Sequence, residues 1–333
     1  MEVTVQLLGT EPQRRLLIRD QSGIGEARRD AQRLASDTGL DETVIGRVGV
    51  VASELATNLL RHGGGGELLL QPVPIEPGAV IEVIAIDRGP GMPSVETCLR
   101  DGYSSAGTSG TGLGAVKRLA AEFDVYSMVG RGTVVMARVG AGRLSHIGAI
   151  CTAKEGESEC GDVWRLAQRN AHSALMVVDG LGHGTLAAEA ARLAAEAFQK
   201  NPFDEPRALI ERMHQALSGT RGAAGACAHL NGSAAVLYAG IGNIAGRLAG
   251  AESSRGLVSH SGTLGFQAPR VQQFEYPVLE ASLLIMHSDG LSARWEIGDH
   301  PGLQRHHPAI IAAVLYRDHC RGRDDSTVVV LSR

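Results

Sequence analysis

The chain has 333 residues, of which 44% are hydrophobic and 20% charged, and its formal net charge is -4. That length is sufficient for two domains with buried cores, and the mixed, slightly acidic charge argues against a nucleic-acid-binding or polybasic membrane-binding role. No apolar stretch reaches transmembrane length and the N-terminus has no signal-peptide pattern, so a cytoplasmic protein without membrane contact is expected. The five cysteines include no Cys-x-x-Cys pair and indicate reduced thiols.

The first 62 residues contain two short strand patterns, at residues 3–8 and 14–20, and two helical patterns. The first helix is Ala- and Arg-rich and covers residues 24–38; the second covers residues 41–61. Its buried stripe consists of apolar residues at helical spacing: Val44, Val48, Val51, Leu55 and Leu59. Glu54 and Asn58 flank this stripe, four residues apart and therefore on one face. Spacing alone favours two ordinary, partly exposed polar groups, so their function depends on the segments that follow.

Those segments form an ordered set of glycine-rich turns and strands. A glycine run at residues 63–66 ends the helix, and two strands follow at residues 67–73 and 79–86. The second strand runs directly into DRGPGM, residues 87–92, and the glycine-rich GTSGTGLG follows at residues 107–114. A helix and a β-hairpin complete the set. A single glycine cluster is weak evidence, whereas the whole order is much more specific.

This order resembles the GHKL ATPase and kinase superfamily over almost all of residues 1–139. The resemblance implies a Bergerat α/β sandwich around an ATP pocket. It also implies that Glu54 is the general base, Asn58 a Mg2+ ligand next to the phosphates, and Asp87 the acceptor for the adenine amino group. Five glycines and one threonine would complete the nucleotide contacts: Gly89, Gly91, Gly110, Gly112, Gly114 and Thr133.

Within this superfamily, the segments SELATNLLRHGGGG, EVIAIDRGPGM and GTGLGAVKRLAAEFDVYSMVGRGT are most similar to the RsbT-type switch kinases of bacteria. Those kinases phosphorylate serine or threonine on STAS-domain proteins in partner-switching and stressosome pathways. A histidine kinase is less consistent with the chain, because only two short strands and one helix precede the helix with Glu54. That leaves no room for a phospho-accepting helical hairpin, and His62 is interpreted as a helix-end residue.

Residues 140–150 (GAGRLSHIGAI) are small and glycine-containing but too short for a long tether, and they separate a first domain, 1–139, from a second, 140–333. The second domain contains a buried strand at residues 174–178, a long Ala-rich helix, and two further helical patterns at 206–217 and 308–318. Asn231-Gly232 between two apolar runs predicts a hairpin. These patterns indicate sheets packed against helices.

Acidic residues mark the strand ends of the second domain. Asp179 ends the buried strand directly before Gly180, and four more aspartates lie at other strand ends: Asp162, Asp289, Asp324 and Asp325. An Asp-Gly turn alone is common, so the evidence for a metal site is the whole set of aspartates at strand ends. Carboxylate and carbonyl oxygens are the ligands that Mg2+ and Mn2+ prefer. Four such carboxylates can hold two ions that activate a water to attack phosphorus.

The motifs around these aspartates, together with AGIGN and GTLG, resemble metal-dependent protein phosphatases of the PPM superfamily. The likeness covers about residues 145–333 and is strongest to the SpoIIE branch and its RsbX type. It implies a β-sandwich flanked by helices, so the whole chain is expected to be α+β.

The PPM resemblance also implies roles for the acidic residues. Asp179 would be catalytic, bridging two Mn2+ or Mg2+ ions with the Gly180 carbonyl on one of them. Asp289 and Asp324 would complete the second ion, and Asp162 would bind the first directly or through water. Asp325 is expected behind the ligands, although the doublet leaves the register open. His183 is interpreted as a structural histidine in a tight loop.

The sequence therefore predicts a bifunctional regulator with an ATP-dependent serine/threonine kinase module and a Mn2+- or Mg2+-dependent phosphoserine/phosphothreonine phosphatase. Its expected partner is a STAS-domain phosphoprotein or an anti-sigma/sigma regulator. Two alternatives stay open. In the first, the N-terminal domain binds ATP or a partner without transferring phosphate and only regulates the phosphatase. In the second, the phosphatase half is silent and serves as a docking domain for the kinase.

Overall fold

The computed structural model describes residues 5–9, 11–75, 78–99, 112–141, 146–230, 232, 235–250, 254–266, 270–278 and 283–332. The chain forms two compact units. The N-terminal unit consists of Gln13–Ser145 and Arg305–Arg317, and the C-terminal unit of Met1–Pro12, His146–Gln304 and Asp318–Arg333. Both units are thus discontinuous in sequence, whereas the sequence analysis placed one boundary after residue 139.

The N-terminal unit is built on a five-stranded antiparallel sheet with the order β2-β3-β4-β6-β5. Its strands are β2 (Arg14–Ile18), β3 (Gly66–Ile75), β4 (Gly78–Ile86), β5 (Glu122–Met128) and β6 (Gly132–Gly140). The register places Gln71, Glu82, Arg138 and Glu122 side by side in one row across four strands. Because side chains alternate between the faces of a sheet, these four polar residues share one face.

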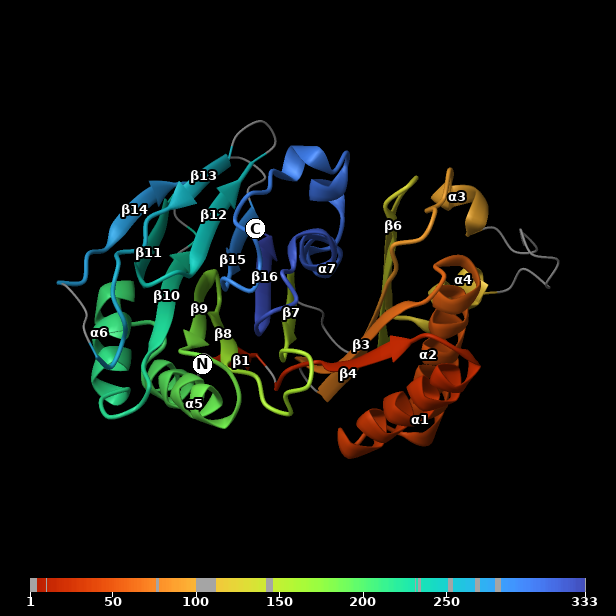
Figure 1. Ribbon diagram of the computed structural model, residues 1–333, viewed down its shortest axis with the longest axis horizontal. Helices are drawn as coiled ribbons and strands as arrows, with labels where there is room; N and C mark the ends of the chain where they lie inside the picture. Colours follow the sequence, from red (N-terminus) through yellow and green to blue (C-terminus); the bar gives the residue numbers. More distant parts are fainter. Residues whose placement is uncertain are drawn as a thin grey trace. The chain divides into compact units, whose positions relative to one another are not determined.

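Helices α1 (Gln21–Asp37) and α2 (Glu42–His62) cover one face of this sheet (Figure 1). Two shorter helices are α3 (Val95–Cys98) and α4 (Gly112–Leu119). Asp41 starts α2 by accepting hydrogen bonds from the amides of Thr43 and Val44, at 2.9 and 3.1 Å, as an N-cap does. The helix ends at Gly63. The predicted helix over residues 41–61 is therefore confirmed.

Helix α2 is, in the part of the chain that the structure describes, the single helix long and apolar enough by length and composition to cross a membrane. Its apolar face instead belongs to the core of the N-terminal unit. Val48, Val51, Leu55 and Leu59 are buried there among residues of β3, β4 and β6. The apolar composition of α2 is thus explained by burial in its own unit.

The C-terminal unit contains a six-stranded and a five-stranded sheet, both antiparallel, with the orders β1-β8-β9-β10-β11-β14 and β13-β12-β15-β16-β7. The first contains β1 (Gln6–Leu8), β8 (Asp162–Arg169), β9 (His172–Gly180), β10 (Ala223–Leu230), β11 (Ala235–Ile241) and β14 (Phe274–Pro277). The second contains β7 (Ile147–Thr152), β12 (Ala245–Ala249), β13 (Ser254–Leu257), β15 (Leu283–His287) and β16 (Ser326–Ser332). One apolar core draws residues from both sheets, so the unit is a β-sandwich.

A second apolar core lies between the six-stranded sheet and helices α5 (Thr185–Lys200) and α6 (Pro206–Ala216). Two short 3-10 helices, Ile297–Asp299 and Leu303–Arg305, precede α7 (Pro308–His319). The predicted hairpin around residues 231 and 232 is confirmed by the pairing of β10 with β11, although Asn231 itself lies outside the described residues. The mixed α+β fold, with its helix-flanked sandwich, agrees with the sequence prediction.

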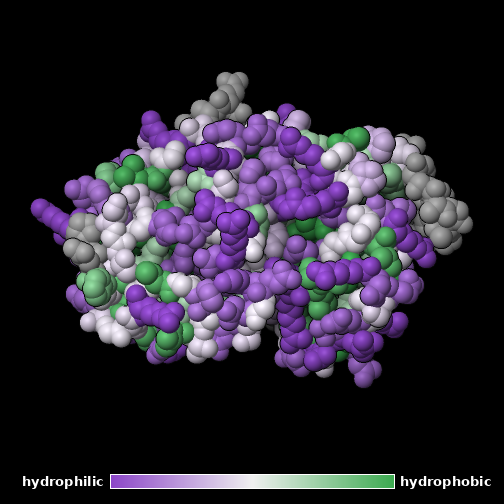
Figure 2. Space-filling view, viewed as in Figure 1, coloured by the Kyte–Doolittle hydropathy of each residue, from purple (hydrophilic) through white to green (hydrophobic). Residues whose placement is uncertain are grey.

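On the face of the molecule drawn in Figure 2, hydrophobic side chains form separate patches among hydrophilic ones.

Two segments lie in a unit that their position in the sequence did not predict. Strand β1 pairs antiparallel with β8 of the C-terminal unit rather than extending the N-terminal sheet. Residues 305–317, which include most of α7, cluster with the N-terminal unit. A short apolar pattern predicts a strand or helix, but its partner depends on contacts distant in the chain, which local spacing does not encode.

Candidate nucleotide and metal sites

Asp87 follows directly after β4 and is fixed by the backbone around it. Its Oδ1 accepts hydrogen bonds from the amides of Gly89 and Thr133, at 2.8 and 3.1 Å. The Asp87 amide in turn donates to the Thr133 carbonyl over 2.9 Å. Burial raises the pKa of Asp87, and the two amide bonds act in the opposite direction. These contacts hold a carboxylate oxygen in place as a hydrogen-bond acceptor, which is what adenine recognition requires.

Three glycines allow the backbone to pack closely around Asp87. A Cβ at Gly91 (φ +71°) would lie 2.2 Å from the Met128 carbonyl oxygen, and one at Gly132 (φ +89°) would lie 2.1 Å from the Asp87 carbonyl oxygen. A Cβ at Gly63 would approach the Asp87 Cβ to 2.6 Å. Only glycine avoids the clash at these three positions, and at Gly91 and Gly132 it also avoids the strain of a positive φ. The sequence analysis named Gly91 but missed Gly63 and Gly132, although both belong to glycine motifs quoted there.

Glu54 and Asn58 lie on one face of α2 next to the start of α4. A Cβ built on Gly112 would lie 3.4 Å from the Asn58 Oδ1 and 3.5 Å from the Glu54 Oε2. The Asn58 Nδ2 is buried and has no hydrogen-bond partner among the described residues. Buried amide donors are rarely left unpaired, so this position suits a bound ligand. Gly114 is buried in α4, and Gly110 lies outside the described residues.

Asp162 and Asp179 are directly opposite each other where β8 pairs with β9. Burial, followed by the charges of Asp162, Asp289, Asp324 and Asp325, raises the pKa of Asp179 to about 9. Burial likewise raises the pKa of Asp162 to about 7, with Asp325 and Asp324 contributing in the same direction. Five carboxylates therefore share one negative region, which a cation would neutralise.

Neighbouring polar groups orient this carboxylate cluster, which consists of Asp162, Asp179, Asp289, Asp324 and Asp325. The Ser288 hydroxyl donates to the Asp162 Oδ2 over 2.6 Å, while the Asp162 Oδ1 is buried without a hydrogen-bond partner in the described part of the chain. The Asn243 amide donates to the Asp289 Oδ2 over 2.6 Å. The sequence analysis assigned no role to Ser288 or Asn243, although Ser288 directly precedes Asp289 and the AGIGN motif contains Asn243.

Asp324 and Asp325 differ in their hydrogen bonds. The amides of Lys154 and Gly161 donate to the two oxygens of Asp325, each over 2.8 Å. The Asp324 side chain is less buried and accepts a bond from the Asp325 amide over 3.0 Å. Both oxygens of Asp325 thus accept hydrogen bonds from backbone amides, whereas Asp324 accepts one such bond.

The carboxylate cluster supplies the oxygen ligands that divalent ions prefer, but its side chains are not arranged in a complete coordination geometry. No three His, Cys, Asp or Glu side chains in the described ranges come close enough to form a ready-made metal cluster. An Asp162 oxygen that is buried and unpartnered among the described residues, together with the raised pKa values, fits a set of hard oxygen ligands for divalent cations. Gly180 is tightly packed, since a Cβ there would lie 2.3 Å from the Ala187 carbonyl oxygen.

His183 forms its hydrogen bond with Glu157 rather than with a residue of the carboxylate cluster. Its Nδ1 is 2.6 Å from Glu157 Oε1, and its side chain is 45% exposed. This pair joins the Gly-rich loop after β9 to the loop after β7. The contact is consistent with the structural role expected from the sequence.

The carboxylate cluster predicts how the stability of the metal-free chain depends on pH. Asp162 and Asp179 have pKa values in the folded state above the ordinary value of 3.8, so the folded chain binds more protons than the unfolded chain. Their contribution to stability is complete below about pH 4 and is lost as the pH rises through about 7 and 9. In EDTA, the melting temperature of Asp179→Asn should therefore rise relative to that of the wild type between pH 5 and pH 9. A difference that does not change with pH would contradict this prediction.

Comparisons with known proteins match a different family to each part of the chain. A family described as histidine kinase-like ATPase domain matches residues 19–139, and the stage II sporulation protein E (SpoIIE) family matches residues 169–333. The serine/threonine-protein kinase RsbT of Bacillus subtilis (strain 168) is 34% identical over 111 residues, which are 33% of this chain and 84% of RsbT. The phosphoserine phosphatase RsbX of the same organism is 28% identical over 141 residues, 42% of this chain and 71% of RsbX.

The chain is also similar to a solved structure described as "The bacterial stressosome: a modular system that has been adapted to control secondary messenger signaling". It has 26% sequence identity and a TM-score of 0.52, and the match covers 56% of this chain and 98% of that chain. Fold and matches together define a fusion of a histidine kinase-like ATPase domain with a SpoIIE-type phosphatase domain. The chain belongs to the histidine kinase-like ATPase family through residues 19–139 and to the SpoIIE family through residues 169–333.

Proposed function

We propose that this chain is a cytoplasmic regulator of a bacterial partner-switching pathway that removes phosphate from phosphoserine or phosphothreonine of a STAS-domain protein. The observation that supports this function best is the group of five mutually repelling carboxylates at strand ends of a SpoIIE-family unit. Its relatives include a phosphoserine phosphatase and a serine/threonine-protein kinase. An anti-sigma or sigma regulator is the alternative partner.

The phosphatase site would be formed by side chains from both sheets of the C-terminal unit. Asp179 and the Gly180 carbonyl, with Asp162, would hold one Mn2+ or Mg2+ ion. Asp179 would also bridge to a second ion that Asp289 and Asp324 complete. When bound, the two ions supply the positive charge and the activated water that phosphate-ester hydrolysis needs. Ser288 and Asn243 would keep Asp162 and Asp289 oriented through their hydrogen bonds.

Asp325 is proposed as a supporting residue rather than a direct ligand. Its two oxygens already accept amide hydrogen bonds from Lys154 and Gly161, so its role is to hold those loops beside the ligands. The choice of Asp324 as the direct ligand rests on its fewer hydrogen bonds and greater exposure.

The N-terminal unit is proposed to bind Mg-ATP and to transfer phosphate to the same class of STAS protein. Asp87 would accept from the adenine amino group, and Gly89, Gly91 and Thr133 would shape the base pocket. Asn58 would bind the Mg2+ that contacts the phosphates, with Gly112 and Gly114 on the phosphate side. Glu54 would orient or deprotonate the acceptor hydroxyl, because phosphoryl transfer depends on positioning and charge neutralisation.

Two replacements on α2 separate ATP binding from transfer. Glu54→Gln should abolish radiolabel transfer from ATP to a STAS protein while leaving ATP affinity unchanged. Asn58→Ala should weaken Mg-ATP binding about tenfold or more while changing stability little, because its buried Nδ2 has no hydrogen-bond partner to lose among the described residues. Calorimetric titration with Mg-ATP measures the affinities, and transfer that survives in Glu54→Gln would refute the role of Glu54.

A second candidate function is a phosphatase controlled by an ATP-binding unit that transfers nothing. The packing of residues 305–317, from the SpoIIE match, within the N-terminal unit favours this candidate. Transfer of label to a STAS protein distinguishes a kinase from such a sensing unit. Mn2+-dependent hydrolysis of an aryl phosphate by the whole chain tests the phosphatase under either candidate, and its absence would refute both.

A further inference from the structure

Helix α7 belongs by sequence to the SpoIIE match but packs within the N-terminal unit. Residues 305–317 cluster with that unit, and the helix is buried over its first ten residues, from Pro308 to Arg317. The helix itself continues to His319, and from Asp318 onward the chain belongs to the C-terminal unit. One uninterrupted helix is thus shared by the two units.

The N-terminal end of α7 is anchored to strand β5. The His307 amide donates to the Asp124 Oδ2 over 2.7 Å, and the His306 Nδ1 lies 2.9 Å from the Asp124 Oδ1. The ring of His306 also packs edge-on against Tyr126, with 5.3 Å between ring centroids. Burial raises the pKa of Asp124, but the bonds from His306 and His307 outweigh burial, and the net effect is a lowered pKa. The carboxylate therefore holds this end of the helix in its charged form.

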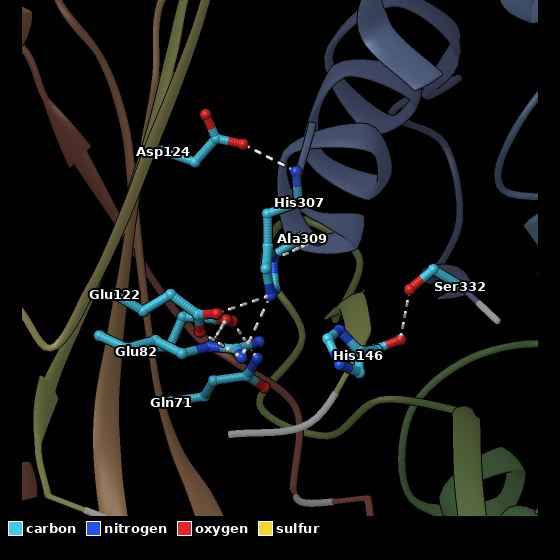
Figure 3. Close-up of polar contacts among 9 residues, drawn as sticks. Gln71, Glu82, Glu122, Asp124, His146, His307, Ala309 and Ser332 are labelled. Atoms are coloured by element: carbon cyan, nitrogen blue, oxygen red, sulfur yellow. Dashed lines mark hydrogen bonds and ion pairs between the residues drawn. The ribbon is translucent and has the colours of Figure 1, made fainter. Parts of the chain in front are cut away.

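His307 also meets the polar row on the N-terminal sheet, as Figure 3 shows. Its Nδ1 accepts from the Ala309 amide over 3.0 Å, which leaves the Nε2 proton to face Glu122 Oε1 at 3.5 Å. Glu122 and Glu82 in turn pair with Arg138, at 2.9 and 2.7 Å. Since Arg138 and Glu82 are almost fully buried, this end of α7 completes a desolvated charge network rather than a loose surface contact.

The C-terminal part of α7 forms hydrogen bonds with Glu67 and with Arg88, which follows Asp87 in the sequence. The Tyr316 hydroxyl donates to the Glu67 Oε2 over 3.1 Å. The Arg88 guanidinium donates to the Arg317 carbonyl oxygen, and Arg88 is the residue after Asp87. After burial and the two amide bonds, the charge of Arg317 is the next influence on the pKa of Asp87. Groups that hold α7 therefore border the carboxylate proposed to bind adenine.

The chain that follows α7 is tied to the proposed metal ligands. The Ser292 amide donates to the His319 carbonyl over 2.9 Å, and the Arg321 amide donates to the Gly290 carbonyl over 2.8 Å. Gly290 is the residue after Asp289, and Asp324 follows three residues after Arg321. The end of α7 is thus bonded to the turn of one proposed ligand and connected by a short segment to another.

We propose that α7 couples nucleotide binding at Asp87 to metal binding at Asp289 and Asp324. An adenine base held by Asp87 restrains the adjacent Arg88 and so the end of α7, which positions the two metal-binding segments. The proposal deepens the proposed function and rests on it, because it assumes both sites. By linkage, adenine binding and Mn2+ binding must strengthen each other by the same factor.

The test uses the full chain and two probes that do not bind each other strongly. Adenosine carries the base but no phosphate, so it does not chelate Mn2+ as ATP does. Calorimetry gives the Kd of adenosine with and without Mn2+, and the Kd of Mn2+ with and without adenosine. Both affinities should rise by the same factor, about fivefold or more. In Asp179→Asn, Mn2+ should no longer change the adenosine Kd, which locates the effect at the C-terminal unit.

Two replacements at α7 contacts should remove the coupling without removing either site. Arg88→Ala deletes the exposed guanidinium that donates to Arg317, and Tyr316→Phe deletes only the hydroxyl bonded to Glu67. Each variant should retain its separate affinities for adenosine and Mn2+ while the mutual factor falls toward one. Arg28→Ala, at an exposed position of α1, is the matched control and should keep the wild-type factor.

The outcomes separate this proposal from the function beneath it. If both probes bind but neither changes the Kd of the other, α7 does not couple the sites, although the proposed function stands. If the factor is the same in Arg88→Ala, Tyr316→Phe and the wild type, the route through α7 is refuted. If adenosine does not bind, the adenine role proposed for Asp87 fails, and if Mn2+ does not bind, the proposed phosphatase fails; either result also refutes the coupling.

Discussion

Asp179→Asn should reduce Mn2+-dependent aryl phosphate hydrolysis by a factor on the order of a thousand, and at the same time make the metal-free chain more stable. The loss of activity follows because Asp179 is the carboxylate proposed to contact both ions, whose charge is worth several kcal/mol to the transition state. The gain in stability follows because Asp179 is repelled by four other carboxylates and its pKa is raised to about 9. Opposite effects of one replacement on activity and stability are expected where a functional site brings together charges that repel each other.

Melting curves at pH 8 in EDTA and in Mn2+, together with steady-state hydrolysis rates, check the Asp179→Asn prediction. Mn2+ should raise the melting temperature of the wild type much more than that of the variant. Asp299→Asn is the matched control, because Asp299 is an exposed aspartate of the same unit outside the carboxylate cluster. A variant that hydrolyses the ester like the wild type would remove Asp179 from the site.

Arg138→Ala should destabilise the chain by about 3–5 kcal/mol, the usual effect of removing one partner of a buried ion pair. The Arg138 and Glu82 side chains are 2% and 1% exposed, and the Arg138 Nε lies 2.7 Å from the Glu82 Oε2. Gln71 Nε2 donates a second bond to Glu82, but an amide does not replace a positive charge. Without the guanidinium, Glu82 is left as a buried carboxylate that must either stay uncompensated or bind a proton.

Urea unfolding measures the effect of Arg138→Ala, and Arg192→Ala is its control. Arg192 pairs with Glu196 on the exposed face of α5, where both side chains are more than half exposed, so little change in the free energy of unfolding is expected. If Arg138→Ala destabilises the chain no more than Arg192→Ala, water must reach Glu82, and the network at the start of α7 is not desolvated.

The local part of both sites could be predicted from the sequence. Apolar runs that end at Asp87 and Asp179 predicted strands whose ends present carboxylates, and helical spacing predicted that Glu54 and Asn58 share one face. The structure shows Asp87 directly after β4, Asp162 at the start of β8 opposite Asp179, and Asn58 beside Gly112. These features follow from neighbouring residues and from motifs, so short-range patterns were sufficient.

The features that the sequence did not predict all depend on distant pairings. Nothing within residues 3–8 indicates that β1 pairs with β8, and nothing within residues 308–318 indicates that α7 packs with the N-terminal unit. The polar row of Gln71, Glu82, Arg138 and Glu122 likewise cannot be predicted from single strands, because each charge acquires its partner only through the register. Ser288 and Asn243 gain their roles in the same way, from carboxylates 126 and 46 residues away.

The central claim, that one chain both adds phosphate to and removes it from the same protein, is tested most directly by labelling. The purified chain would be incubated with radiolabelled ATP, Mg2+, Mn2+ and STAS-domain proteins of the source organism, and protein-bound label followed over time. Label should accumulate well above the wild-type level with Asp179→Asn, which transfers but does not hydrolyse, and should be absent with Glu54→Gln. Equal label with Asp179→Asn and wild type would contradict the opposing activities. No label with any variant would leave the N-terminal unit as an ATP-sensing regulator without transfer.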